Sequence, residues 1–432
     1  MPEPVSFQAP KGTFDVLPPA SAAYERVVAT FAGLAGRAGY GLVVSPMFED
    51  VGVFHRVGEA TDVVRKEMYD FDDKGGRRLA LRPEGTASVV RAYIEHRPPL
   101  PFKAWYAAPS FRYEAPQADR FRQHHQLGVE ALGTEDPDLD VEVIALLDAF
   151  YRALGLQRIT LRINSLGDDR CRPVYRRELE SFLAARADQL CPDHRERFAD
   201  NPLRVLDCKK PACVAATVGA PFQLDHLCEP CAKHFARVGE GLSAVGVAST
   251  LDPRLVRGLD YYTRTTFEFG ADALESAQNA VGGGGRYGGL AEALGGPPTP
   301  GIGFGSGIER VLLACAAEGV APAGERPIEV FVVDTTGGGA ARDLTHELRA
   351  AGIGADRAWD QRSFKAQFKA ADRSGARLAL VVGSDEEERS MVAIKTLRAG
   401  STGGVGEGSA GSAHQQEVAR SAVIDVVSKM LG

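Results

Sequence analysis

The sequence lacks three features that would indicate a membrane, secreted or broadly basic protein. No stretch approaches the roughly 20 apolar residues of a membrane-spanning helix, and the first residues do not pass from a basic segment into an apolar one, as a secretory signal does. Basic residues are outnumbered, with 50 Lys and Arg against 57 Asp and Glu and a net charge of −7. We therefore expect a cytoplasmic protein that does not coat nucleic acid through a broad basic surface.

The chain does have length and an excess of glycine. Its 432 residues predict two or three domains, and 44% hydrophobic with 25% charged residues is typical of a soluble globular enzyme. Glycine accounts for 48 residues, about 11% against a usual ~7%. Twelve of these glycines lie between Gly282 and Gly307, where we expect the backbone to approach a bound ligand closely.

A Pro/Gly-rich stretch at 322–327 predicts a linker, with one domain over residues 1–325 and a second over 328–432. Within the first, residues 170–245 hold most of the seven cysteines and helix-like charged runs, which predict a helical insertion. The second domain alternates predicted strands and helices, which favours an α/β fold with a mostly parallel sheet. Its expected elements are strands at 328–333 and 378–382 and helices at 340–351, 363–374 and 418–431.

A hairpin with one polar face is predicted over residues 102–132. Because side chains alternate along a strand, His124, Gln126 and Glu130 share one face of its second strand. Arg112 and Glu114 share one face of the first strand. Two interpretations fit: a solvated face of an antiparallel sheet, or a pocket for a polar ligand of mixed charge. A planar guanidinium such as that of Arg112 suits a phosphate group.

The same hairpin resembles motif 2 of the class II aminoacyl-tRNA synthetases, in the variant of the histidyl-tRNA synthetases. The resemblance rests on FRYE at 111–114 and RFRQHHQ at 120–126. Other segments resemble further motifs of that family, in the family's order, which argues against chance matching. They are KGTFDVLP at 11–18, RPEGT at 82–86, LVRGLDYY at 255–262, GGRY at 284–287 and GIGFGSGIER, motif 3, at 301–310.

The resemblance implies an α+β catalytic core, in which helices flank a mainly antiparallel sheet, and a C-terminal α/β anticodon-binding domain. It also implies a two-step reaction. The carboxylate of L-histidine attacks the α-phosphate of ATP to give histidyl-adenylate and pyrophosphate, and the 3′-terminal adenosine of tRNA(His) then accepts the histidyl group. Mg²⁺ would accompany ATP. The family's motif 1 corresponds to residues 26–46 and implies a homodimer.

Family roles for the phosphate-binding residues carry over to matching positions. Arg112 and Arg257 match the two catalytic arginines at the α-phosphate, and Arg310 matches the motif 3 arginine. His124 stands where the family usually has an aromatic residue that stacks on adenine. The implied ATP-binding set is Arg112, Glu114, Arg120, His124 and Arg310.

Another set of residues matches the positions that bind histidine in the family. Three of them, Glu84, Thr86 and Gln126, correspond to residues that hold the amino group, although Glu84 could instead cap a helix. Glu130 and Tyr262 correspond to readers of the ring nitrogens. The implied histidine-binding set is Glu84, Thr86, Gln126, Glu130, Tyr261, Tyr262 and Tyr287.

Contacts with tRNA are expected in both domains. Gln117 lies in the motif 2 turn, where Ala115 replaces the arginine that the family commonly uses for the acceptor end. In the last domain Lys365, Lys369 and Arg373 repeat at intervals of four, so they share one helix face. That face is either simply solvated or contacts tRNA phosphates without reading sequence.

Short-spaced cysteines in the insertion resemble the ligand pairs of a structural zinc site. Cys228 and Cys231 form a CxxC pair, and Cys208 and Cys213 are five positions apart. These four residues are our expected zinc ligands. The alternative is a set of unligated thiols in a helical insertion that clamps the acceptor stem.

Two other functions remain to be separated from the main interpretation. One is a catalytically silent paralogue that regulates histidine biosynthesis; such relatives tend to lose the arginines and the last domain, which this chain retains. The other is a class II synthetase for another small amino acid, against which the segment 255–262 argues.

Overall fold

The computed structural model describes residues 7–58, 64, 66–113, 121–256, 261–274, 279–320, 328–397 and 415–432. The chain divides into two compact units, Met1–Ala323 and Gly324–Gly432. Across the described ranges, none of the helices combines the length and the apolar character needed to cross a bilayer.

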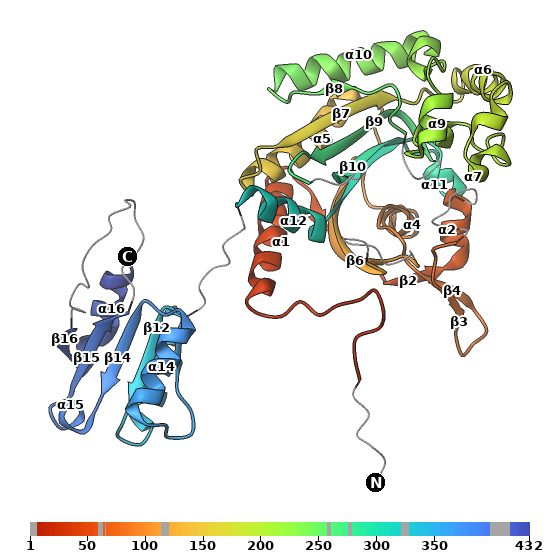
Figure 1. The fold of residues 1–432 in the computed structure, drawn as a ribbon. Helices are drawn as coiled ribbons and strands as arrows, with labels where there is room; N and C mark the ends of the chain where they lie inside the picture. Colours follow the sequence, from red (N-terminus) through yellow and green to blue (C-terminus); the bar gives the residue numbers. More distant parts are fainter. Residues whose placement is uncertain are drawn as a thin grey trace. The chain divides into compact units, whose positions relative to one another are not determined.

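The first unit is built on an eight-stranded sheet with the order β1-β5-β6-β11-β10-β9-β7-β8 (Figure 1). The strands at the two edges, β1 and β8, run parallel to their neighbours β5 and β7. All other neighbouring strands in the sheet are antiparallel. The expected mainly antiparallel sheet is therefore confirmed. The strands are β1 (Gly41–Leu42), β5 (Phe102–Phe111), β6 (Gln123–Leu132), β7 (Ile159–Ser165), β8 (Thr250–Leu251), β9 (Tyr262–Ala271), β10 (Ala280–Tyr287) and β11 (Gly301–Gly307).

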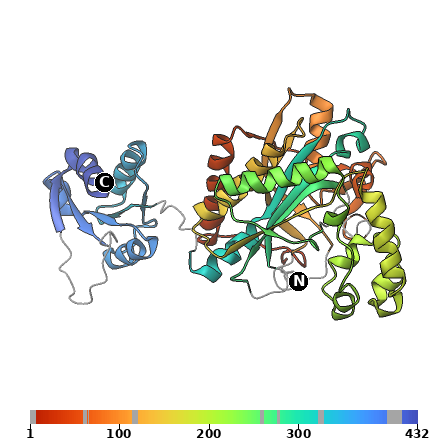
Figure 2. The same cartoon turned by 90° about the horizontal axis from the view of Figure 1, so that it is seen from above.

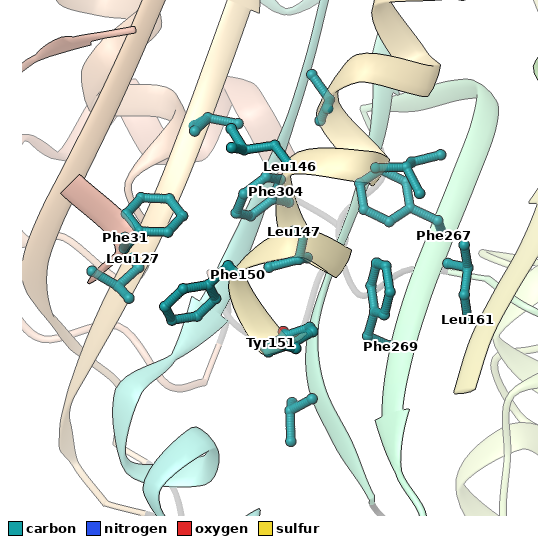
Figure 3. Packing of buried hydrophobic residues seen from close by; sticks show 14 of the residues in the cluster. Phe31, Leu127, Leu146, Leu147, Phe150, Tyr151, Leu161, Phe267, Phe269 and Phe304 are labelled. Atoms are coloured by element: carbon teal, nitrogen blue, oxygen red, sulfur yellow. The ribbon is translucent and has the colours of Figure 1, made fainter. Parts of the chain in front are cut away.

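One face of this sheet forms the main hydrophobic core. It packs against α1 (Ala20–Arg37), α5 (Pro137–Ala153) and α12 (Ile308–Glu318). Figure 3 shows aromatic rings from helices and strands meeting there; the Phe31 ring lies edge-on to Phe150 and Phe304, with centroids 5.2 and 6.0 Å away. Helix α5 begins at Pro137 because the Asp136 side chain accepts the N–H of Asp138 and a proline suits the first turn of a helix.

The other face of the sheet curves around α4 (Thr86–His96), as Figure 1 shows. Residues of α4 pack with Leu132 of β6 and Tyr287 of β10. The nearby elements are α2 (Val51–Gly58), α11 (Leu290–Ala293) and a small sheet of β2 (Phe48–Asp50), β4 (Arg78–Leu81) and β3 (Asp70–Asp72). This face carries the polar residues of the hairpin.

The insertion is helical and has its own small core, which includes Tyr175, Leu179 and Leu183. Its short helices lie together beside the sheet (Figures 1 and 2). The long helix α10 packs against α5. The elements are α6 (Arg172–Ala184), η1 (Ala187–Gln189), α7 (Pro192–Arg195), α8 (Leu203–Leu206), α9 (Pro211–Ala216), η2 (Gln223–His226) and α10 (Glu229–Ala244).

The second unit is an α/β domain whose sheet has the order β13-β12-β14-β15-β16. Only the pairs β12·β13 and β12·β14 are parallel, so the expectation of a mostly parallel sheet is wrong for half of it. The elements are β12 (Val330–Asp334), α13 (Gly339–Ala350), β13 (Ala355–Arg357), α14 (Phe364–Ser374), β14 (Leu378–Val382), α15 (Ser384–Glu388), β15 (Met391–Thr396), β16 (Gln415–Ala419), η3 (Arg420–Ala422) and α16 (Val423–Leu431).

The start of the last helix differs from the expected residue 418. Gln415–Ala419 instead pairs with β15 as an edge strand, and α16 begins at Val423. The pattern of exposure alternates along β16, which is the period of a strand.

Candidate functional site

Glu130 lies at the centre of the polar face, on a strand between β5 and β11, and is fully buried. Two hydroxyl groups donate to its carboxylate. Thr86 Oγ1 of α4 donates to Oε1 at 2.6 Å, and the Tyr287 hydroxyl of β10 donates to Oε2 at 2.6 Å. Three predicted histidine-binding residues, from three elements, are therefore joined directly.

Glu84 precedes α4 and is also buried. Its carboxylate accepts the N–H groups of Thr86, at 2.6 Å, and Ala87, at 2.8 Å. The helix-capping role considered for Glu84 is thus present in the structure. The cap places this carboxylate close enough to Glu130 for the two charges to interact.

The Glu84 and Glu130 carboxylates repel each other when both are ionised. Burial raises the pKa of Glu130 to about 8, and the neighbouring Glu84 adds to that rise, whereas the hydrogen bonds from Thr86 and Tyr287 oppose it. Burial also raises the pKa of Glu84, against the backbone N–H groups and the charge of Arg112. Among the described residues, no Lys or Arg forms an ion pair with Glu130. The site therefore suits a ligand that brings a cationic or hydrogen-bond-donating group to Glu130.

Three tyrosines border the carboxylates. The Tyr261 ring centroid lies 4.6 Å from that of Tyr262 and 5.7 Å from that of Tyr287. The buried hydroxyl of Tyr261 has no hydrogen-bond partner in the described part of the chain. Tyr106 of β5 lies over Gly128, where any Cβ would overlap its ring. Tyr106 was not predicted from the sequence.

Gly303 of β11 gives a test of how tightly the site is built. A Cβ at Gly303 would overlap the Glu130 carboxylate and the Val129 carbonyl, whereas one at Gly305 would meet only the Gln126 side chain, 3.7 Å away. Gly303→Ala should therefore lower the free energy of unfolding by about 1–3 kcal/mol. Gly305→Ala is the matched control and should change it by less than about 0.5 kcal/mol. Equal losses in urea unfolding would contradict the described packing.

The predicted nucleotide residues lie toward the other end of the hairpin. Arg112 follows β5, and its Nε donates to the Pro83 carbonyl at 3.0 Å. On β6, Gln126 Oε1 accepts from the Ser110 hydroxyl at 3.3 Å. Burial lowers the pKa of His124 to about 3, with further contributions from the charges of Arg112 and His125, so its ring is neutral at physiological pH.

Arg310 lies in the first turn of α12, directly after β11. Its Nε donates to the Ala280 carbonyl of β10 at 2.6 Å. The segment that resembles motif 3 therefore forms a strand followed directly by a helix. Four predicted site residues lie outside the described part of the chain: Arg257, Glu114, Arg120 and Gln117.

A buried ionic cluster supports β10 from the opposite face and was not predicted. Arg286 donates to Asp140 Oδ1 through both Nε, at 2.9 Å, and Nη2, and Asp140 Oδ2 contacts His234 Nε2 at 2.8 Å. The His234 hydrogen bond and the Arg286 charge keep the pKa of Asp140 below its usual value in spite of burial. Arg286 precedes Tyr287, so the cluster fixes the strand that carries this tyrosine. The position of Arg286 within the GGRY segment was the sequence feature that could have indicated its importance.

A cavity of about 970 Å³ adjoins the site and shares Tyr261 and Tyr287 with it. Its wall also includes Asp168 and Arg264. Glu84 and Glu130 do not line this cavity, so the buried carboxylates are separate from it.

In the second unit, Lys365, Lys369 and Arg373 are exposed on α14, as their spacing predicts. A separate cavity of about 660 Å³ lies where β12 and β13 end. Its wall includes Trp359 and Phe364, whose side chains are 59% and 50% exposed. The Arg357 guanidinium lies 4.2 Å from the centroid of the Trp359 ring. We did not predict this aromatic surface, because the short strand β13 that precedes Trp359 was not predicted from the sequence.

The expected set of four cysteine ligands is wrong as one site. The structure groups Cys208 and Cys213 with Cys191 and His194, and it groups Cys228 and Cys231 with Asp168 and Cys171. In each group all ligand atoms lie within 4.8 Å of one another. The short pairs were recognised correctly, but pairing between them depends on tertiary contacts that spacing does not encode.

Comparison with known proteins agrees with the motifs and the strand order. The family model described as histidyl-tRNA synthetase matches residues 12–168 and 179–311, and the anticodon binding domain model matches 320–430. The histidine–tRNA ligase of Rhodococcus erythropolis is 53% identical over 401 residues, covering 91% of this chain and 94% of that protein. The histidine–tRNA ligase of Moorella thermoacetica is 47% identical and covers 98% of both.

A solved structure gives the same result. Apo histidyl-tRNA synthetase of S. aureus superimposes with a TM-score of 0.80 at 35% identity, covering 98% of this chain and 100% of that one. The chain therefore belongs to the histidyl-tRNA synthetase family.

Proposed function

We propose that the polar face of β6 is where this histidine–tRNA ligase binds L-histidine and ATP and joins them into histidyl-adenylate. The observation that carries the proposal is the buried Glu130, which has two hydroxyl donors and, among the described residues, no cationic partner. A neutral imidazole offers an N–H to such a carboxylate. An apolar side chain of similar size would leave Glu130 desolvated and unpaired, at a cost of about 1–3 kcal/mol or more.

The neighbouring residues divide the recognition of the amino acid. Glu84, Thr86 and Gln126 hold the ammonium group, which is attracted by the carboxylate of Glu84. Tyr262 addresses the second ring nitrogen opposite Glu130. Tyr261 and Tyr287 close the pocket, and the hydroxyl of Tyr261 is available to the ligand because no described group satisfies it.

ATP lies next to the amino acid in this proposal, toward Arg112. The Pro83 carbonyl accepts a hydrogen bond from Arg112 Nε and so orients the side chain. The guanidinium of Arg112 then binds both the α-phosphate and the histidine carboxylate. His124 stacks on adenine as a neutral ring, and Arg310 binds near the phosphates at the start of α12. Arg257 approaches the α-phosphate from the other side, Arg120 binds the outer phosphates, and Glu114 contacts adenine or a magnesium-bound phosphate.

Such a site works mainly by positioning and by stabilising charge. In-line attack of the carboxylate on phosphorus needs the two reactants held together and the charge on the phosphate oxygens neutralised. Mg²⁺ supplies part of that charge when it is bound to ATP. Glu114, proposed to contact adenine or a magnesium-bound phosphate, lies outside the described residues.

Amino-acid-dependent exchange of pyrophosphate into ATP tests the proposal. Exchange should occur with L-histidine and fall to background with every other standard amino acid. Absent exchange would favour the silent regulatory paralogue, and faster exchange with another amino acid would favour a synthetase of different specificity. The names of the close relatives favour histidine over both.

The second unit is proposed to bind the anticodon stem and loop of tRNA(His). Trp359 and Phe364 offer exposed rings on which unpaired bases can stack, and Arg357 adds positive charge beside them. Lys365, Lys369 and Arg373 contact phosphates from α14. In the first unit, Gln117 is proposed to contact the acceptor end.

Trp359→Ala should separate tRNA binding from amino-acid activation. Loss of one stacked base costs about 1–3 kcal/mol, so the KM for tRNA should rise by about 5- to 150-fold in aminoacylation assays. Pyrophosphate exchange, which needs no tRNA, should be unchanged. Lys429→Ala, an exposed change on α16, is the control and should leave both rates near wild type. An unchanged KM for tRNA in Trp359→Ala would remove this surface from the proposal.

We further propose that the chain acts as a homodimer in the cytoplasm. The segment matching motif 1, residues 26–46, ends in exposed apolar side chains that include Leu42 and Val44, at 56% and 85% exposure. Met47 and Phe48 extend this apolar surface. Such clustering suits an interface between two copies.

A further inference from the structure

The insertion contains a second chemical centre that the ligation reaction does not use. Cys191 and His194 flank the start of α7, Cys208 follows α8, and Cys213 lies in α9. Although these residues span 23 positions of the chain, their ligand atoms all lie within 4.8 Å of one another. Three sulfur atoms and one imidazole nitrogen, with no carboxylate among them, form a donor set that is typical of structural zinc.

The distances within this group fit tetrahedral coordination. His194 Nδ1 lies 3.4 Å from Cys191 Sγ and 3.6 Å from Cys213 Sγ. Zinc bonds of about 2.3 Å to sulfur and about 2.0 Å to nitrogen, at tetrahedral angles, place a sulfur and a nitrogen ligand about 3.5 Å apart. The imidazole therefore already lies at the separation from both sulfurs that a shared zinc ion requires.

The surroundings also suit bound metal. The backbone N–H of Cys191 donates to Cys213 Sγ at 3.3 Å, so the sulfur lies in a polar setting. The Lys210 ammonium bonds to Asp193 at 2.5 Å, so a cation lies between two of the ligand segments. A zinc ion with three thiolates and a neutral imidazole carries one net negative charge. The Lys210 ammonium, although paired with Asp193, is close enough to Cys191 and Cys208 to interact with that charge.

The helices that carry or adjoin these four residues are short and have few stabilising contacts of their own. Helices α7 and α8 have four residues each and α9 has six, and helices this short are unstable without tertiary support. The apolar cluster that supports them is small and includes Cys191 and Cys213 themselves. Small cores of this kind are commonly held by metal ions or disulfides, and all seven cysteines are free thiols in this structure.

The second cysteine group has a different explanation. Its sulfurs surround the Asp168 carboxylate, with Cys171 and Cys228 each 3.7 Å from Oδ1. The other oxygen, Oδ2, is bound by Arg170 at 2.7 Å and lies 3.6 Å from Arg264. Thiol-to-carboxylate hydrogen bonds and arginine pairing therefore account for this group without an ion.

From these observations we propose that Cys191, His194, Cys208 and Cys213 bind one structural zinc ion that holds α7, α8 and α9 together. This site replaces the four-cysteine set expected from spacing. The relevant pattern is C-x2-H followed after 13 residues by C-x4-C.

Metal analysis of the full chain, purified without an affinity tag that binds metal, tests the proposal. Inductively coupled plasma mass spectrometry should find at least one zinc per chain. The double variant Cys208→Ser/Cys213→Ser should lose one zinc per chain, whereas the matched double variant Cys228→Ser/Cys231→Ser should lose none. No zinc in the wild-type chain, or loss only in the second variant, would overturn the proposal.

X-ray absorption at the zinc edge keeps the test independent of how well the variants fold. The wild-type chain should show three sulfur ligands at about 2.3 Å and one nitrogen at about 2.0 Å. Removing the metal with 1,10-phenanthroline should expose residues 187–220 to limited proteolysis. A ligand shell of two sulfurs, or protection unchanged after metal removal, would contradict the site.

Discussion

Replacement of Glu130 by glutamine is expected to lower histidine-dependent pyrophosphate exchange by about 10²-fold or more. The change keeps the shape of the side chain, but its amide NH2 replaces one of the two oxygens that accept from Thr86 and Tyr287. It removes the carboxylate that, in our proposal, gives up its proton when histidine binds and then holds the imidazole N–H through adenylate formation. Stopped-flow or steady-state exchange measures the loss. Glu318→Gln, far along α12 from the site, is the control and should retain wild-type rates.

The same variant should be more stable than the wild-type chain at alkaline pH. The pKa of Glu130 is raised from an ordinary value near 4.5 to about 8, so the folded chain holds a proton that the unfolded chain releases. Stability from this group is complete below the unfolded pKa and is lost as pH rises through about 8. The difference in Tm between Glu130→Gln and wild type should therefore grow from pH 5 to pH 8 and then level off. A difference that is constant with pH would show that Glu130 is not buried as described.

Replacement of Arg112 is expected to have a comparable effect through the nucleotide. Arg112→Ala should lower the rate of exchange by about 10²- to 10³-fold, as for loss of one transition-state donor. Arg112→Lys should restore only part of that loss, because an ammonium group cannot bind two oxygens as a planar fork does. Pre-steady-state measurement of adenylate formation separates this effect from weaker histidine binding.

The control for Arg112 is Arg77→Ala in the β3–β4 hairpin. The Arg77 side chain is 78% exposed and pairs with Asp73, so its loss should change neither rate nor stability measurably. Wild-type exchange in Arg112→Ala would remove that guanidinium from the mechanism. Equal loss in both variants would show that the effect is a general change in charge.

The polar face of the hairpin could be predicted because strand periodicity is local. Alternation alone places His124, Gln126 and Glu130 together, and the register of β5 against β6 keeps them there. The motif 3 arginine was equally accessible, since a glycine-rich strand followed by helix-forming residues needs no distant information.

What the sequence could not reveal depends on contacts between distant residues. Asp140 and Arg286 are separated by 146 positions, and Asp140 and His234 by 94. The cysteine pairs were visible as short spacings, but which pair joins which is decided by how α7 and α9 pack. The three-residue strand β13 is defined by its partner β12 more than by its own composition.

The account rests on one claim, that the buried carboxylate of β6 binds the amino acid substrate. A crystal structure of the full chain with L-histidine tests this most directly. We predict that an imidazole nitrogen lies within about 3 Å of the Glu130 carboxylate, with the ammonium group near Glu84. Histidine bound elsewhere, for example in the cavity lined by Asp168 and Arg264, with Glu130 left without a ligand, would contradict the account.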